Sequence, residues 1–239
     1  MDAPSPNFGS RRGGARPDLV VIHYTAMTTA EAALERLRDP AAEVSAHWLV
    51  AEDGRVWRLV DEAMRAWHAG AGAWGDVTDV NSRSIGIELA NPGPLAGFPP
   101  FPEPQMAALE RLLAGILDRW GIAPAGVIAH SDMAPGRKAD PGPKFDWRRL
   151  ARGGLAAWPD PPGDGAGGAV AFRAAAAAAG YRAPGDDWQT TLAAFRLRFR
   201  PWAAGPLAPE DVAAAQGLPC LPVDGRRTQR ESRHNPSRS

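Results

Sequence analysis

The sequence contains a single cysteine, Cys220, among its 239 residues. One cysteine cannot form an internal disulfide, and it excludes a zinc site built from several thiolates. Any metal bound by this chain must therefore be held by histidine, aspartate or glutamate. Basic and acidic side chains are equal in number, 27 of each, so the formal net charge is +0. Because nucleic-acid-binding proteins normally carry a basic excess, we expect no nucleic acid as a partner.

Long apolar runs are also absent. Residues 1–18, MDAPSPNFGSRRGGARPD, lack the apolar stretch of about 7–15 residues that a secretory signal needs, and they lack the early cysteine of a lipoprotein. No later run approaches the roughly 18 apolar residues of a membrane span. We therefore expect no transmembrane segment and a cytoplasmic location, or a periplasmic one if the given start is truncated.

The composition that remains is that of a folded protein, with 44% hydrophobic and 23% charged residues. The length allows one sizeable core and a smaller module. Strand-like patterns occur four times: a β-branched run at 18–24, a hairpin at 45–60 with its turn at Asp53-Gly54, an alternating segment at 83–91, and a short run at 126–130.

Two helices are expected between these strands. Residues 28–39 begin with a capping box, Thr28 and Glu31, and continue with good helix formers. Residues 102–122 carry apolar side chains at helical spacing, and Gly121 is expected to close the helix. The order strand, helix, hairpin, strand, helix, strand predicts a mixed α/β fold, in which helices flank one central mixed β-sheet.

The C-terminal third has a different composition. We expect the α/β domain to occupy residues 1–151 and a Gly/Pro-rich linker to follow at 152–168. Three helical stretches, at 169–181, 187–202 and 208–218, predict a small helical module over residues 169–222. The last segment, 223–239, holds five arginines against one Asp and one Glu, and we expect it to be disordered.

Two histidines stand at matching places. His23 and His130 each end an apolar strand, and Asp140 follows His130 on a loop rich in proline and glycine. Either histidine alone is better interpreted as a structural residue. If the two strands are neighbours, both imidazoles lie at one edge of the sheet and Asp140 can reach them. Two histidines and one carboxylate are the ligand set of a catalytic Zn2+ site with one open position.

Two further residues would complete a hydrolase. Glu88 lies on the polar face of an otherwise apolar strand, where a lone carboxylate is costly to bury. Near a metal it could act as general base and then as general acid. Lys138, two residues before Asp140, could stabilise a developing oxyanion, although a solvated surface position is the usual one for lysine.

Five segments in this order resemble one known family: VVIHYTA, SAHWLV, AWHAG, NSRSIGIELAN and AHSDMAPGRKADPGPKFDW. They are similar to N-acetylmuramoyl-L-alanine amidases of the AmpD and AmiD type, which are related to phage T7 lysozyme and the peptidoglycan recognition proteins. The resemblance covers roughly residues 5–150, and GRKADPGPKFDW is its most specific part. It implies a central mixed sheet flanked by helices, and hydrolysis of the amide between N-acetylmuramic acid and L-alanine in peptidoglycan or muropeptides.

The resemblance also implies residue roles. His23, His130 and Asp140 match the zinc ligands, Glu88 the catalytic acid/base, and Lys138 the residue that stabilises the transition state. Three residues are candidates for contact with the substrate: Tyr24, which could instead only pack; His68, in a loop with two tryptophans; and Asn81, which matches an asparagine near the stem peptide. His47 is equally compatible with a structural and a functional role, and His234 lies in the basic tail.

Two alternatives to an amidase stay open, namely a non-catalytic receptor for wall fragments on the same fold and a different zinc hydrolase. The C-terminal module resembles, through TLAAFRLRFRP, a small peptidoglycan-binding-like domain, but it could also merely support the α/β domain. We expect a monomer.

Overall fold

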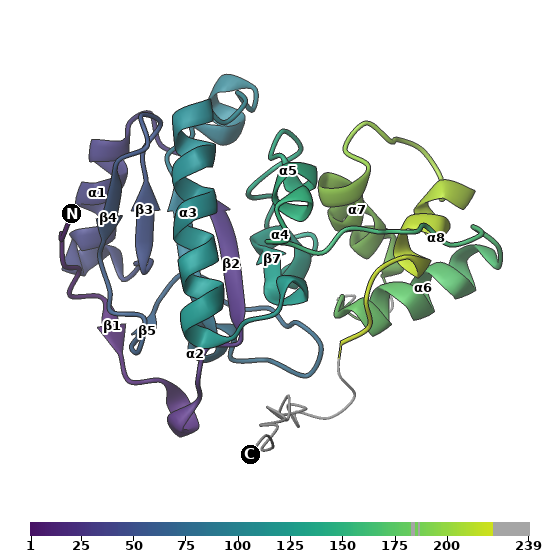
Figure 1. Ribbon diagram of the computed structural model, residues 1–239, viewed down its shortest axis with the longest axis horizontal. Helices are drawn as coiled ribbons and strands as arrows, with labels where there is room; N and C mark the ends of the chain where they lie inside the picture. The colour runs from purple at the N-terminus through teal and green to yellow at the C-terminus, as the bar shows by residue number, and fades with distance from the viewer. Residues whose placement is uncertain (183–184, 186, 222–239) are drawn as a thin grey trace, which may run out of the picture.

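The central element of the computed structural model is a five-stranded mixed sheet with the strand order β4-β3-β6-β2-β7 (Figure 1). The structure describes residues 1–182, 185 and 187–221, so the expected disordered tail and His234 lie outside the described residues. The sheet confirms the mixed α/β fold. Its strands are β2 (Leu19–Tyr24), β3 (Trp48–Val50), β4 (Val56–Arg58), β6 (Ser84–Leu89) and β7 (Val127–Ala129).

Strands β3, β6, β2 and β7 are parallel, and only β4 runs antiparallel, as the second strand of the expected hairpin. Parallel strands are covered on both faces, which explains why β2 is a continuous apolar run rather than an alternating one. A separate short ribbon pairs β1 (Phe8–Gly9) with β5 (Arg65–Ala66). Because the carboxyl ends of the parallel strands share one edge, residues at the ends of β2, β6 and β7 are brought together.

One face of the sheet is covered by α3 (Glu103–Trp120), the long helix in front of the sheet in Figure 1. Leu109, Leu113 and Ile116 of this helix pack on Ile85 and Ile87 of β6. The helix ends where expected, because Gly121 adopts the left-handed conformation (φ 61°) and its amide donates to the last carbonyls. Helix α5 (Trp147–Arg152) contributes to the same core.

The other face is covered by helices at both ends, and between them by the loop that carries His68, whose ring packs on Gly86 of β6. Helix α1 (Ala30–Arg38) packs at the β3–β4 end. It begins one residue later than expected. Thr29, rather than Thr28, caps it by accepting a hydrogen bond from the amide of Ala32 at 3.1 Å. The prediction of Thr28 was therefore wrong: Thr28 has Glu31 three residues later, but the helix is capped by Thr29, whose third following residue is Ala32.

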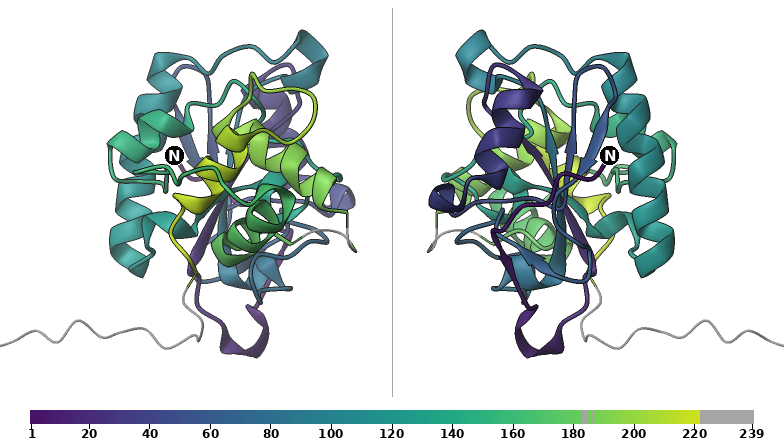
Figure 2. Two further views of the ribbon diagram at one scale, coloured as in Figure 1. Left: turned by 90° about the vertical axis from the view of Figure 1, so that its right-hand side faces the viewer. Right: turned by 90° about the vertical axis from the view of Figure 1, so that its left-hand side faces the viewer.

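The β2–β7 end is covered by the three C-terminal helices, α6 (Gly168–Ala179), α7 (Trp188–Phe199) and α8 (Pro209–Gln216). Figure 2 shows them gathered at one end of the molecule. Phe172, Phe195 and Val212 of these helices belong to the same apolar cluster as Val21 and Ile128 of the sheet. The helical module is therefore packed directly against the sheet face on which the site lies.

The Gly/Pro-rich segment between α5 and α6 also packs. Ala156 is buried, and the ring of Trp158 lies 5.5 Å from that of Phe199 on α7. The remaining elements are short: α2 (Val80–Arg83), α4 (His130–Met133), and the 3-10 turns Arg12–Gly14, Pro40–Ala42, Gly93–Ala96 and Pro124–Gly126. Within the described residues, no helix is both long and apolar enough to cross a membrane.

Candidate metal centre

His23, His130 and Asp140 meet at the carboxyl edge of the sheet. His23 is the penultimate residue of β2. His130 was expected to end its strand, but it is the first residue of α4, directly after β7. Nδ1 of His23 lies 2.9 Å from Nδ1 of His130, and each of these nitrogens lies 2.9 Å from Oδ2 of Asp140. All three residues are buried. The short distances agree with the prediction from the sequence that these side chains converge.

The opposite nitrogen of each imidazole has a partner that orients the ring. Nε2 of His130 donates to the carbonyl of Ala69 at 2.8 Å, so its Nδ1 carries no proton in the neutral ring. Nε2 of His23 lies 3.0 Å from Nδ1 of His68, and Nε2 of His68 lies 3.3 Å from the Ser84 hydroxyl, which donates to the carbonyl of Val80. Because the Ser84 hydroxyl donates to Val80, Nε2 of His68 donates to Ser84 and Nε2 of His23 donates to Nδ1 of His68. Nδ1 of His23 is then unprotonated as well.

Electrostatics keep these groups in the protonation states that metal ligands require. Burial, reinforced by the charge of His130, lowers the pKa of His23 to about 4, so the ring is neutral at pH 7. Burial opposes ionisation of Asp140, but its close contacts with the imidazoles of His130 and His23 outweigh it and hold the pKa of Asp140 below its usual value. A neutral His23 and an ionised Asp140 are the states in which these side chains can bind a metal ion.

Three electron-rich atoms at 2.9 Å with no proton between them repel one another unless a cation is present. This observation shows that the residues fit a metal ion. Two imidazole nitrogens and one carboxylate oxygen, with further hydrogen bonds that fix the ring orientations, form a set of ligands suited to a divalent metal ion.

Glu88 lies next to this cluster, because it is the partner of His23 in the parallel pairing of β6 with β2. Its side chain is on the face opposite Ile85 and Ile87, as the alternation predicted. Burial, with the charge of Asp140, raises the pKa of Glu88 well above its ordinary value. Its Oε2 is buried and has no hydrogen-bond partner among the described residues. A carboxyl oxygen left free beside a metal cluster is available to exchange a proton with a ligand.

A cavity of about 480 Å³ opens over the cluster. It is lined by the three candidate metal ligands and by Glu88, together with Tyr24, His68 and Lys138. Seven of the eight residues predicted for the site are therefore at this cavity.

The eighth, Asn81, does not line the cavity. It is buried, and its Oδ1 accepts the amides of His68 at 3.1 Å and Ala69 at 2.9 Å. Asn81 thus holds the backbone that supplies the Ala69 carbonyl to His130. This position differs from the contact with the stem peptide that the resemblance implied.

His68 contacts both the cavity and His23, because its side chain lines the cavity and lies behind the His23 ring. Its ring packs so closely on β6 that a Cβ added at Gly86 would lie 2.5 Å from it. The glycine of the IGIEL motif is explained by this contact. His47 is fully buried and belongs to the scaffold: its Nδ1 accepts the amide of Gly86 at 2.9 Å, and burial lowers its pKa to about 4.

Lys138 and Arg137 follow α4 on the rim of the cavity. Lys138 is exposed, and its backbone is fixed by a hydrogen bond to the carbonyl of Ala134 at 3.1 Å. Arg137 was not singled out from the sequence. Its guanidinium donates to the Ala69 carbonyl at 2.7 Å and also to the Ala71 carbonyl, so it ties the loop containing His68 to the loop containing Asp140. Because this segment contains several basic residues, the sequence alone does not indicate that Arg137 makes these backbone contacts.

Fold and site together define a class of protein: a mixed α/β hydrolase scaffold with a His-His-Asp metal cluster at the carboxyl edge of its sheet. Comparison with known proteins agrees. Residues 13–143, more than half of the chain, match the family model described as N-acetylmuramoyl-L-alanine amidase. The chain belongs to this family.

Curated relatives include AmiD of Escherichia coli K12, an N-acetylmuramoyl-L-alanine amidase that is 45% identical over 157 residues. That alignment covers 61% of this chain and 56% of AmiD, so the matched part spans little more than half of the relative. The 1,6-anhydro-N-acetylmuramyl-L-alanine amidase AmpD of the same organism is 32% identical over 164 residues, covering 62% of this chain and 87% of AmpD.

Solved structures show the same relationship over a longer part of the chain. The E. coli AmiD complex with anhydro-N-acetylmuramic acid-L-Ala-D-γ-Glu-L-Lys has a TM-score of 0.77 and 36% identity, covering 87% of this chain and 91% of that one. AmpDH3 of Pseudomonas aeruginosa has a TM-score of 0.79 and 33% identity, covering 87% and 93%. Since both cover 87% of this chain, the likeness extends beyond the α/β part.

Proposed function

We propose that the protein is a zinc-dependent N-acetylmuramoyl-L-alanine amidase, which hydrolyses the amide between N-acetylmuramic acid and L-alanine in peptidoglycan or its muropeptide fragments. One observation carries the proposal most directly. Two imidazole nitrogens and one carboxylate oxygen converge within 2.9 Å of one another, beside the unpartnered carboxyl oxygen of Glu88, in a single cavity. The named activities of AmiD and AmpD, and the muropeptide bound in the AmiD complex, support the substrate class.

In this proposal His23, His130 and Asp140 hold the zinc, which when bound supplies Lewis-acid and water-activating chemistry. Glu88 takes the proton of the attacking water on its free Oε2 and returns it to the nitrogen of the leaving L-alanine. Burial raises the pKa of this carboxyl group, which makes its ionised form a stronger base for the water proton than an ordinary glutamate. The Lys138 ammonium stabilises the negative charge that develops on the carbonyl oxygen.

The cavity walls support proposals for the remaining residues. Tyr24 and His68 line the space that a substrate would fill, with Tyr24 half-exposed at the end of β2. We propose that Tyr24 contacts the substrate and that His68 both borders it and orients His23. For Asn81 we propose a positioning role through the backbone of His68 and Ala69. The alternative of a non-catalytic receptor gives no reason to retain Glu88 and Lys138 at the cavity.

The proposal is tested with anhydro-N-acetylmuramoyl-L-Ala-γ-D-Glu peptides. Mass spectrometry should detect two products, the free anhydro sugar and a peptide that begins with L-alanine. A chelator should abolish their formation, and added zinc should restore it. Binding of the intact muropeptide without cleavage, by protein that contains stoichiometric zinc, would instead support a receptor.

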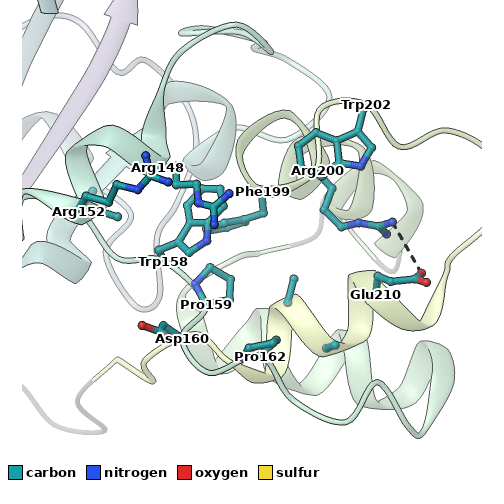
Figure 3. Close-up of a pocket in the computed structure, with 14 residues that line it drawn as sticks. Arg148, Arg152, Trp158, Pro159, Asp160, Pro162, Phe199, Arg200, Trp202 and Glu210 are labelled. Atoms are coloured by element: carbon teal, nitrogen blue, oxygen red, sulfur yellow. Dashed lines mark ion pairs between the residues drawn. The ribbon is translucent and has the colours of Figure 1, made fainter.

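We further propose that the C-terminal helices offer a second surface for the wall. A groove of about 1000 Å³ lies between α5, the segment before α6, and helices α7 and α8 (Figure 3). Its walls include Trp158 and Trp202, the latter 75% exposed, and two arginines, Arg148 and Arg152, which have no ion pair among the described residues. Exposed indole rings suit sugar faces, and unpaired guanidinium groups suit the carboxylates of stem peptides.

Co-sedimentation with insoluble peptidoglycan tests this surface. Trp202→Ala and Arg148→Ala/Arg152→Ala should reduce the bound fraction, while cleavage of a small soluble muropeptide stays unchanged. Arg111→Ala, which removes an exposed arginine of α3 far along the chain from the groove, is the control. Equal binding by all variants would leave the module without a role in wall binding.

Two expectations about the protein in solution and in the cell also stay proposals. We propose a monomer, which light scattering of the purified protein tests. We propose a cytoplasmic location, which fractionation of cells that produce the full natural gene product tests.

A further inference from the structure

Asp132 is a fully buried carboxylate close to the metal cluster, but it is not one of the ligands. It belongs to α4, the single helical turn that begins with His130. Its Oδ2 accepts the amide of Ala129 at 2.8 Å, which closes the start of that turn. A buried charge is costly unless it is paired and hydrogen-bonded, so the other partners of Asp132 matter for the position of α4.

Those other partners come from the C-terminal helical part of the chain. Nη1 of Arg198, on α7, donates to Oδ2 of Asp132 at 2.7 Å. The hydroxyl of Tyr181, which follows α6, donates to Oδ1 at 2.6 Å. Arg198 and Tyr181 are both buried. The charge of Asp132 is thus satisfied from outside the α/β part of the chain.

Arg198 also contacts the far end of the same loop. We name residues 130–146, which run from His130 through Asp140 to the start of α5, the ligand loop. The Arg198 guanidinium lies 4.1 Å from the ring centre of Trp147, the first residue of α5. Its Nη2 donates to the carbonyl of Ala157 at 3.2 Å. One arginine of α7 therefore contacts a residue near each end of the ligand loop.

The ligand loop has little regular structure of its own to fix it. Helix α4 has four residues, far fewer than a helix needs for independent stability. Within the loop, the amide of Ser131 donates to the carbonyl of Asp140 at 3.0 Å, so a shift of α4 would be transmitted to the third ligand. Metal affinity depends on ligand orientation, and loss of an outer hydrogen-bond partner typically lowers it by about 10–100-fold.

We propose that Arg198 and Tyr181 are positioning residues for the metal centre, which act through Asp132 and Trp147 on the ligand loop. The C-terminal helices are then part of the support of the active site, whatever surface they offer to the wall. The inference rests on the metal centre of the proposed function, but not on the identity of the substrate.

The chain offers a closely matched control. Arg196 is also on α7, is also buried, and also pairs with a buried aspartate: its Nη2 lies 2.5 Å from Oδ2 of Asp211. Its remaining bonds go to the carbonyls of Gly205 and Pro206, so all of these partners lie within the C-terminal part. Arg198→Met and Arg196→Met make the same chemical change, two residues apart, and only the first breaks contact with the ligand loop.

Zinc affinity, measured by competition with a chromophoric chelator, is the main readout. Arg198→Met should raise the zinc Kd by about 10–100-fold. The zinc Kd of Arg196→Met should stay within about threefold of that of the parent protein, even if the Tm of this variant falls as much as that of Arg198→Met. Hydrogen exchange of the segment 129–140 in the metal-free protein should be faster in Arg198→Met only. Where activity is measured, kcat should fall more than KM rises. Equal zinc affinities in Arg198→Met and Arg196→Met at equal Tm would overturn the proposal.

Two milder variants cover the case in which Arg198→Met does not fold. Tyr181→Phe removes one hydrogen bond to Asp132 and keeps the ring. Arg198→Lys keeps a charge for Asp132 but loses the planar group over Trp147. Both should bind zinc more weakly than the parent, and unchanged affinity in both would also overturn the proposal. If the parent protein bound no zinc, the metal centre of the proposed function would be wrong, and exchange in the segment 129–140 alone would decide the positioning role.

Discussion

His23 on β2 and Glu88 on β6 are partners in the parallel register of the two central strands. Paired residues point to the same face of a sheet, so the proposed first metal ligand and the proposed acid/base are placed side by side by backbone pairing alone. A shift of one residue would bring Ile87 to this position and turn Glu88 into the apolar core. The relation between the proposed ligand and the proposed acid/base is thus set by the pairing of the two central strands.

Removal of one imidazole should empty the metal centre. His130→Ala deletes a ligand whose second nitrogen is bound to the Ala69 carbonyl, and two remaining ligands cannot hold zinc tightly. Elemental analysis should find about one zinc per chain in the parent protein and little in the variant, because one three-ligand site binds one ion. Stoichiometric zinc in His130→Ala would show that the ligands are elsewhere.

His68 should matter for the metal without binding it. His68→Ala removes the group that faces Nε2 of His23 and leaves that ring free to turn. We expect the zinc Kd to rise by about 10–100-fold, the usual effect of losing such a partner. His47→Gln is a useful comparison, because His47 is buried near His68 but is not bonded to a ligand. Similar zinc affinities in the two variants would argue against the orienting role.

Lys138 is an exposed lysine at the cavity rim, and it either stabilises the developing oxyanion or is only a solvated surface residue. If it stabilises the developing oxyanion, Lys138→Ala should lower kcat by about 10²–10³ while KM stays near its original value. Zinc content should persist, since lysine is not a ligand. Lys138→Arg should recover only part of the rate, because it keeps the positive charge but its planar guanidinium places that charge differently. An unchanged kcat in Lys138→Ala would show that Lys138 is only a solvated surface residue.

Tyr181 gives a pH dependence of stability. Burial, with the charge of Asp132, raises the pKa of its phenol well above 10, so the folded state favours the neutral form. The stabilisation is present below the unfolded pKa of about 10 and is lost as the pH rises above it. The Tm of the parent protein should therefore fall between about pH 9 and 11, and it should fall less in Tyr181→Phe. Burial and the charge of Asp140 also raise the pKa of the half-exposed Tyr24, but not as far, so Tyr24→Phe should change the dependence of Tm on pH less than Tyr181→Phe does. The same dependence of Tm on pH in the parent protein and in Tyr181→Phe would show that Tyr181 is not the cause.

The sequence predicted most of what local patterns determine. Apolar spacing and Gly121 located α3, and the Asp53-Gly54 turn located the hairpin of β3 and β4. His23 and His130 were recognisable because each stands at the end of an apolar run, and parallel strands bring their ends together. Alternation along β6 placed Glu88 on the correct face.

What the sequence did not predict depends on contacts between distant segments. Arg198 and Asp132 are 66 positions apart, and although each lies in a segment that resembles the family, nothing in either segment indicates that the two side chains pair. Asn81 was matched to a substrate contact, whereas its amide oxygen is used by two backbone amides 12 and 13 residues away. A polar residue that supports a ligand and one that touches a substrate look alike until the fold shows which groups already occupy its hydrogen-bonding atoms.

Glu88 provides the most direct test of the central claim. Glu88→Gln keeps the size of the side chain and leaves all three metal ligands in place, but it removes the group that carries the proton. The account predicts about one zinc per chain and a normal Tm in this variant, with kcat for anhydro-muropeptide cleavage lower by roughly 10² or more. Zinc and turnover should be measured on the same sample. Near-normal turnover by zinc-loaded Glu88→Gln would contradict the account.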